Sequence, residues 1–237
     1  MQTNPRLQKF FDLASDFGPK PAATQPECEP SRGGRRSFLR GATLAAAAIP
    51  AALVTATPAA AQIQDNAENR ERFVDIQRHE NLHVIALEFF LGDNARPEPT
   101  FKDLQTFDYE EFLKLAQTFE NVGVGAYLGA VPFIADPDVL EAAGSIALIE
   151  ARHAGFLNTF QETRITQNVF RQEQAFERVL TAASVRNLAG PFIADLNGGP
   201  PLFYTQGNDI QIMNFALALE YLEREFYNLN VPYFFPA

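Results

Sequence analysis

The stretches IQRHENLHVIALEFF at residues 76–90 and IALIEARHAGFLNTF at residues 146–160 repeat one helical pattern, displaced by 70 positions. In each stretch a glutamate precedes a histidine by three residues, and apolar residues recur around the pair at helical spacing. Residues three apart share one face of a helix, so each pair can offer an oxygen and a nitrogen to one ion. The pairs are Glu80 with His83 and Glu150 with His153, flanked by Ile76, Leu87 and Phe90 in the first copy and by Ile146, Leu157 and Phe160 in the second.

A second pair of stretches repeats with a displacement of 100, namely AQTFENVGVGAY at 116–127 and ALALEYLEREFY at 216–227. At the matching position each has a glutamate among apolar neighbours, with a tyrosine seven residues, or two helical turns, later. Together the two repeats indicate a helical hairpin that has been duplicated. The matched residues are Ala116, Glu120 and Tyr127 in the first copy, and Ala216, Glu220 and Tyr227 in the second.

Apolar periodicity and helix boundary signals predict four long helices. They span about 66–91, 108–131, 137–162 and 208 or 209 to just before Pro232, and Asp136-Pro137 supplies an N-cap followed by a first-turn proline. The short link at 132–137 predicts antiparallel neighbours, whereas the link of about 16 residues after the first helix leaves the first two helices parallel. The sequence therefore predicts an all-α four-helix bundle built from two similar hairpins, with two crossover connections and no sheet.

The longest link, 163–207, is expected to hold a short helix near 182–188 and then a loop rich in glycine and proline. It forms part of the bundle domain, which we place at 62–237. Its aromatic stretch LFYTQG at 202–207, like the tail VPYFFPA at 231–237, is expected to cover an end of the bundle; capping an active-site mouth is the alternative.

Carboxylates rarely occupy an apolar core unless something compensates their charge. Four core glutamates and two histidines from four helices form the ligand set of a di-metal carboxylate site, and two divalent cations would balance the four negative charges. The alternative is that these side chains are solvated or satisfy one another. Mixed oxygen and nitrogen ligands suit iron or manganese better than a closed zinc site. The predicted ligands are Glu80, His83, Glu120, Glu150, His153 and Glu220.

The fourth helix offers two glutamates for one ligand position. Its apolar arc centres closer to Glu223, whereas the repeat selects Glu220, which we take as a bridging ligand. Glu223 is then an additional ligand or a nearby hydrogen-bond acceptor, and its counterpart Gly123 leaves room for a substrate or bridging solvent. Tyr127 and Tyr227 can hydrogen-bond ligands of the opposite half or act as redox-active phenols, although a buried, hydrogen-bonded tyrosine is the commoner case.

The repeat leaves some polar residues and glycines without a role at the site. His79 falls outside the repeat and is expected at the surface or its boundary, and Glu88 is interpreted as a charge on a helix face. Gly125 and Gly129 are expected to allow close helix packing.

Residues 1–61 resemble an export signal rather than part of the bundle. GRRSFLR at 34–40 precedes an alanine-rich apolar run and the small-residue pattern ATPAAAQ, which predicts a twin-arginine signal cleaved between Ala61 and Gln62. An uncleaved membrane anchor is the alternative. Export would place the protein in the periplasm or outside the cell, without membrane insertion of the mature chain, and the one cysteine, Cys28, would be removed.

The charge of the remaining chain excludes some partners. Residues 1–61 hold 7 of the 19 Lys and Arg and 4 of the 29 Asp and Glu, so the remainder carries 12 basic and 25 acidic side chains, a net charge of −13. Such a charge opposes binding to nucleic acid or to an anionic membrane. A homo-oligomer is compatible with the sequence, which contains no pattern for or against one.

Several stretches resemble the ferritin-like superfamily, and within it the desiccation-related proteins: HENLHV, FENVGVGAYLGA, IALIEARHAG and NFALALEYLEREFY. The resemblance covers most of residues 70–230 and implies a four-helix bundle with ligands in the order Glu, Glu-x-x-His, Glu, Glu-x-x-His. Here the helix resembling the family's first comes last, which indicates a circular permutation. The resemblance leaves the reaction open.

Two functional classes follow from the sequence. The first is an oxidoreductase that uses two metal ions on peroxide, dioxygen or ferrous iron in stress protection. The second is a non-enzymatic protein of the cell envelope that protects or sequesters metal. No catalytic residue is assigned.

Overall fold

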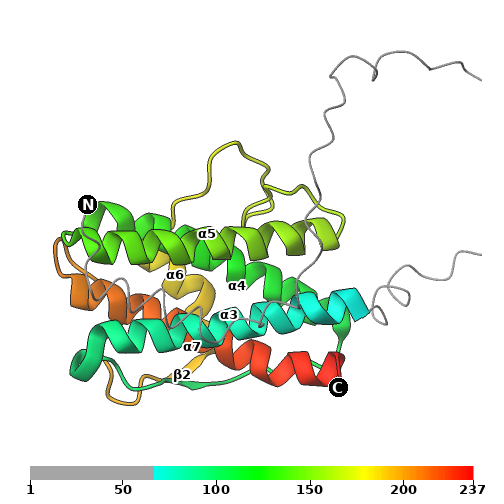
Figure 1. The fold of residues 1–237 in the computed structure, drawn as a ribbon, viewed down its shortest axis with the longest axis horizontal. Helices are drawn as coiled ribbons and strands as arrows, with labels where there is room; N and C mark the ends of the chain where they lie inside the picture. The colour runs from blue at the N-terminus through cyan, green and yellow to red at the C-terminus, as the bar shows by residue number, and fades with distance from the viewer. Residues whose placement is uncertain (1–66, 237) are drawn as a thin grey trace, which may run out of the picture.

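Four long helices run along a common axis in the computed structural model, which describes residues 67–236 (Figure 1). This architecture confirms the predicted all-α bundle. The expected signal at 1–61 lies outside the described residues. Among those that are described, no helix is both long and apolar enough to span a membrane. The long helices are α3 (Ala67–Leu91), α4 (Tyr109–Ala130), α5 (Pro137–Phe160) and α7 (Asp209–Phe234).

Side-chain caps fix where three of these helices begin. Asp108, Asp136 and Asn208 each accept a hydrogen bond from a backbone N–H in the first turn of the helix that follows. The prediction that the last helix ends before Pro232 is wrong, because α7 continues through it to Phe234. A proline in the last turn removes only one intrahelical hydrogen bond, and the burial of Phe234 and Phe235 beyond it favours the continued helix.

The helices pack as two antiparallel hairpins. α4 packs mainly against α5, to which the short link joins it, and α3 packs mainly against α7, the most distant helix in the sequence. Figure 1 shows that α3 and α4 run in one direction and α5 and α7 in the other. The topology of two hairpins and two crossovers is therefore the one that the link lengths predict.

The two crossovers pair with each other. The second contains α6 (Ala182–Ala189), which matches the expected short helix, followed by β2 (Ile193–Asp195). β2 pairs antiparallel with β1 (Thr100–Phe101) of the first crossover. The prediction of no sheet is wrong in this detail, because strands of two and three residues are too short to show an alternating pattern.

Aromatic side chains close both ends of the bundle. Near the start of α3, Phe235 of the tail stacks on Phe73 with ring centroids 4.8 Å apart, and Phe234 stacks on Phe112 at 5.0 Å. At the opposite end, Tyr204 of the long link meets the ring of Phe215 edge to face. These segments cover the bundle ends, as expected.

Two glycines of α4, Gly125 and Gly129, pack closely against the long crossover rather than against another helix. The backbone N–H of Leu180 donates to the carbonyl of Gly125 at 3.0 Å. A Cβ atom at Gly125 would lie 2.6 Å from Leu180 Cγ, and one at Gly129 would overlap the Leu180 carbonyl. The expected close packing is present, but its partner is the extended chain before α6.

We predict that Gly129→Ala destabilises the protein by about 1–3 kcal/mol, because the added methyl group must displace backbone atoms. Gly144→Ala in α5 is the matched control, since a Cβ there meets nothing within 4 Å. The control should be neutral or stabilising by up to about 1 kcal/mol, because alanine favours helix. Urea unfolding measures both variants, and equal stabilities would contradict the proposed close approach.

Candidate metal centre

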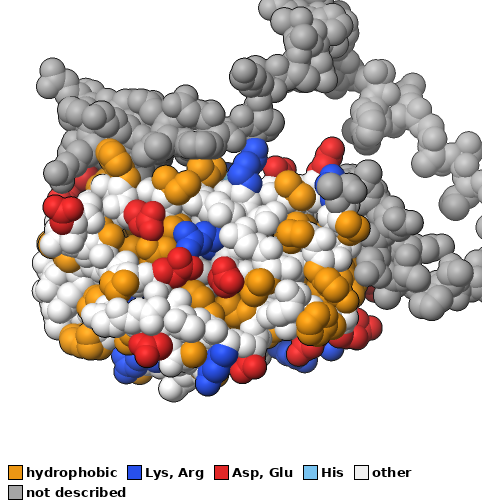
Figure 2. Space-filling model, turned by 90° about the horizontal axis from the view of Figure 1, so that it is seen from below, with side chains coloured by type: hydrophobic (Ala, Val, Ile, Leu, Met, Phe, Trp, Pro, Cys, Tyr) orange, Lys and Arg blue, Asp and Glu red, His pale blue; other side chains and the backbone are white. Residues whose placement is uncertain are grey.

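The six predicted ligands meet at the middle of the bundle. α3 contributes Glu80 and His83, α5 contributes Glu150 and His153, and α4 and α7 contribute one glutamate each, Glu120 and Glu220. On the face seen in Figure 2, acidic side chains are scattered among basic and hydrophobic ones. The site carboxylates, in contrast, are at most 2% exposed, and both histidines are buried.

The ligand atoms form two overlapping groups, within each of which they lie no more than 4.8 Å apart. Both groups contain Glu80 and Glu150. The sequence favoured Glu220 as the bridging residue, but the structure places it in one group only. The shared positions belong to the two Glu-x-x-His motifs because α3 and α5 both present their glutamate toward the bundle axis. The groups are Glu80, Glu120, Glu150 and His153, and Glu80, His83, Glu150 and Glu220.

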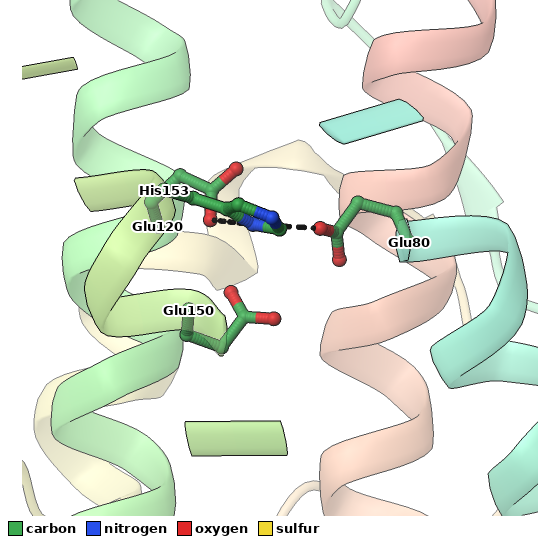
Figure 3. Close-up of side chains that lie close together, drawn as sticks. All are labelled: Glu80, Glu120, Glu150 and His153. Carbon is green, nitrogen blue, oxygen red and sulfur yellow. Dashed lines mark hydrogen bonds and ion pairs between the residues drawn. The ribbon is translucent and has the colours of Figure 1, made fainter. Parts of the chain in front are cut away.

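Each imidazole turns its Nδ1 toward the carboxylates. In the group drawn in Figure 3, His153 Nδ1 lies 3.0 Å from Glu120 Oε2 and 3.1 Å from Glu80 Oε1. In the other group His83 Nδ1 lies 3.2 Å from oxygens of both Glu80 and Glu220 and 3.0 Å from Glu150 Oε1. The duplicated motif thus produces two similar arrangements of one nitrogen facing several oxygens.

Two tyrosines bind the outer oxygens of the terminal carboxylates across the halves. The Tyr127 hydroxyl donates to Glu220 Oε1 at 2.5 Å, and the Tyr227 hydroxyl donates to Glu120 Oε1 at 2.5 Å. Burial raises the pKa of both phenols well above 10, and the negative carboxylates raise it further. Both hydroxyls therefore stay protonated and orient Glu120 and Glu220.

Glu223 lies beside the two groups rather than in either. A Cβ atom at Gly123 would lie 3.0 Å from Glu150 Oε2 and 3.2 Å from Glu223 Oε1, so the space above this glycine is occupied by two carboxylates. The sequence had assigned that space to substrate or solvent. Burial raises the pKa of Glu223 well above its usual range, and Glu150 and Glu220 raise it further.

Several buried carboxylate oxygens lack a hydrogen-bond partner. Neither oxygen of Glu150 makes a hydrogen bond of acceptable geometry, although Oε1 lies near His83, and Glu223 Oε2 has no partner among the described residues. Leaving a buried acceptor unsatisfied costs about 1–3 kcal/mol, and more for a charged group. Oxygens that are unpaired and converge with imidazole nitrogens fit a site for metal cations.

Protons compensate the buried charge when no cation does. Burial lowers the pKa of His83, but Glu80 and Glu220 outweigh burial and raise it well above 6.5. Burial raises the pKa of Glu80, but His83 and His153 reverse that effect and lower it. Burial, reinforced by Glu80 and Glu120, raises the pKa of Glu150 well above 4.5. The metal-free core thus holds protons that cations would displace.

His79 is a neighbour of the site that the sequence reasoning missed. Its Nδ1 lies 2.9 Å from His153 Nε2, and the two rings stack with centroids 5.2 Å apart. Burial, followed by the neighbouring His153 and His83, lowers the pKa of His79 to about 4. A neutral His79 can accept the Nε2 proton of His153 and so leave its Nδ1 free for a cation. The expected boundary position is correct, since His79 is half-buried.

Glu88 makes a side-chain contact that the sequence did not predict. It is half-buried and accepts a 2.6 Å hydrogen bond from the Tyr221 hydroxyl, so it is more than a charge on a helix face. The α3–α7 packing that creates this contact follows from the long-range pairing of the two helices, which no local pattern around Glu88 indicates.

The model of the ferritin-like domain matches residues 38–163, more than half of the chain. This chain belongs to the ferritin-like domain family. The matched segment of this ferritin-like protein includes both Glu-x-x-His motifs and Glu120, whereas Glu220 and Glu223 lie beyond it and are placed at the site by the fold. No curated protein and no solved structure matches the chain.

We predict that the thermal stability of the metal-free protein falls as pH rises above about 6.5, where His79 is neutral in both the folded and the unfolded chain. Glu150 and Glu223 have folded pKa values raised above 4.5, so the folded protein still holds protons that the unfolded chain has already released. His83 acts in the same direction, because its stabilising charge is lost as pH rises through its raised pKa. Glu80, with a lowered pKa, affects the slope only below about pH 4.5.

Circular dichroism melts of chelator-treated protein measure this dependence. Glu223→Gln should make it shallower, because an amide of the same shape does not titrate. A melting temperature that stays constant or increases across the range would contradict the proton-filled core.

Proposed function

We propose that the protein binds two transition-metal ions, iron or manganese, between its two hairpins. The observation that supports this most is the pair of overlapping ligand groups whose shared carboxylates have unpaired oxygens. Oxygen-rich sites with one nitrogen per ion suit these metals. We assign the six ligands as Glu80, His83, Glu120, Glu150, His153 and Glu220, of which Glu80 and Glu150 belong to both ligand groups.

Bound in this way, two such ions would supply one-electron redox chemistry and open positions for an oxygen-containing substrate. The chain's own contribution is to hold the ligands in place. Tyr127 and Tyr227 fix the terminal carboxylates through their short hydrogen bonds, and His79 holds the ring of His153. The surrounding burial excludes bulk water from these contacts.

We infer that Glu223 serves the site as an additional ligand or as a hydrogen-bond donor and acceptor beside Glu150. Four ionised glutamates would balance two divalent ions. A fifth ionised glutamate would add an uncompensated negative charge, so we expect Glu223 to be protonated. If the site held more positive charge, the same carboxyl could release its proton and compensate that charge. Unchanged metal content and unchanged optical spectrum in Glu223→Gln would contradict this role.

The activity that we propose is oxidoreduction of peroxide, dioxygen or ferrous iron in stress protection. Belonging to the ferritin-like family and having a buried cluster both support a redox centre. We further propose that the protein belongs to the desiccation-related branch and is exported through its twin-arginine signal to the periplasm or beyond, on the residues named above.

A circular permutation is also part of the proposal. The last helix, α7, packs antiparallel against α3, so the two form a hairpin in which α7 corresponds to α4 of the other hairpin. From α3 the chain continues through a crossover to α4, which runs parallel to α3. Taking α7 first therefore restores the ligand order Glu, Glu-x-x-His, Glu, Glu-x-x-His.

We predict about two metal ions per chain in the purified exported protein and less than one in Glu150→Gln, since both groups share this carboxylate. Glu141→Gln is the matched control, because Glu141 lies on the same helix with an exposed side chain and should keep both ions. Elemental analysis by mass spectrometry measures the content. Wild-type protein with less than one ion per chain would overturn the di-metal site.

Turnover distinguishes the enzyme from a protein that only sequesters metal. Peroxide and ferrous-iron consumption should be measured on the fully loaded wild type, on Glu80→Ala and on the Glu141→Gln control. Consumption by the wild type and control that is lost in Glu80→Ala supports the oxidoreductase. Two bound ions without turnover would instead support sequestration.

A further inference from the structure

An apolar cavity lies between the four long helices on one side of the metal centre. Its lining residues belong to the last turns of α3 and α4 and to the first turns of α5 and α7. These turns lie at the same end of the bundle (Figure 1). The centre of a water-sized sphere can move through about 20 Å³ of it, which is room for one small molecule. Its walls include Leu87, Ala126, Tyr127, Ala130, Ala216 and Leu219.

The cavity is close to one of the two ligand groups. Leu87 follows His83 by four residues, and Ala216 precedes Glu220 by four residues, so both wall residues lie about one helical turn from a ligand, about 6 Å along the axis. Tyr127 belongs to both places, since its ring lines the cavity and its hydroxyl donates to Glu220. Tyr127 therefore links the cavity wall directly to a residue of the ligand group.

The walls offer almost nothing to a polar guest. All the lining residues are aliphatic or aromatic apart from Met213, and the one hydroxyl among them already donates to Glu220. An apolar cavity of this kind stays dry and takes up apolar molecules. Hydrated ferrous iron and hydrogen peroxide both need hydrogen-bond partners that these walls lack.

In the other half of the duplicated fold, the position equivalent to one wall residue carries a large aromatic side chain. Phe226 stands at the position equivalent to Ala126, and its ring packs against Phe112 at 5.5 Å and Phe119 at 5.0 Å. Phe226 is fully buried. One half of the bundle therefore closes over its tyrosine with phenylalanine rings, while the other half stays open beside Tyr127 because its residue is alanine.

We propose that this cavity binds dioxygen and delivers it past Tyr127 to the ligand group of His83 and Glu220. The proposal rests on the proposed metal function for the delivery, but the binding itself does not require metal. Of peroxide, dioxygen and ferrous iron, dioxygen is the apolar substrate and therefore the one that the apolar walls favour.

Dioxygen binding can be tested on the metal-free protein, because dissolved dioxygen is paramagnetic and accelerates the NMR relaxation of methyl groups near it. Under oxygen pressure, the methyl groups of Ala126, Ala130 and Ala216 should relax faster than that of exposed Ala183. Ala126→Phe, which copies Phe226, should abolish the effect at Ala130 and Ala216, and the smaller Ala126→Val should reduce it. Relaxation no faster than at Ala183, or unchanged in both variants, would overturn the cavity site.

Delivery is tested on the ferrous-loaded protein with an oxygen electrode. Ala126→Phe should lower the rate of dioxygen consumption at least about tenfold at unchanged metal content. Ala183→Val is the control and should keep the wild-type rate. Wild-type consumption in Ala126→Phe would overturn delivery through the cavity. Cavity relaxation in a protein that binds fewer than one metal ion would support the binding site while overturning the proposed metal function.

Discussion

Five carboxyl groups lie in the core of a helical bundle, and the need to compensate their charge governs the rest of the structure. Each is at most 2% exposed, and the cost of an isolated buried carboxylate would exceed the net stability of a typical domain. Two imidazoles, two phenolic hydroxyls and bound protons supply the compensation without metal. Metal ions would replace the protons at the same oxygens, so folding and metal binding depend on one cluster.

The two hairpins contribute equivalent residues to this cluster at most positions. The positions that are not equivalent indicate where the two hairpins differ in role. Glu80 and Glu150 are equivalent, as are the two tyrosines, each of which reaches across to the terminal carboxylate of the other half. The equivalence fails where Gly123 opposes Glu223, which brings a fifth carboxyl to the centre. The equivalence also fails at position 126. Ala126 has no ring like that of its counterpart Phe226, and it lines the cavity.

Much of the fold follows from the sequence because the repeats and caps are local signals. Asp136-Pro137 marks the start of α5, and the link lengths determine which helices run parallel. The meeting of the six predicted ligands also follows, from the predicted core faces and, for Glu220, from the repeat. What could not be predicted depends on contacts between distant segments: the seating of Leu180 on Gly125 and Gly129, the short β1–β2 pairing, and the contact of His79 with His153. Which ligands belong to both groups likewise depends on how the helices are rotated relative to one another. A helical wheel drawn for a single helix does not contain that information.

The central claim is that each of the two ligand groups, which have Glu80 and Glu150 in common, would hold one metal ion. Anomalous X-ray diffraction from crystals of the metal-loaded protein, recorded on both sides of the iron and manganese absorption edges, tests this claim most directly. The account predicts two anomalous peaks, one within reach of His153 and Glu120 and the other within reach of His83 and Glu220, with oxygens of Glu80 and Glu150 between them. A single peak, or peaks only at surface carboxylates, would contradict it.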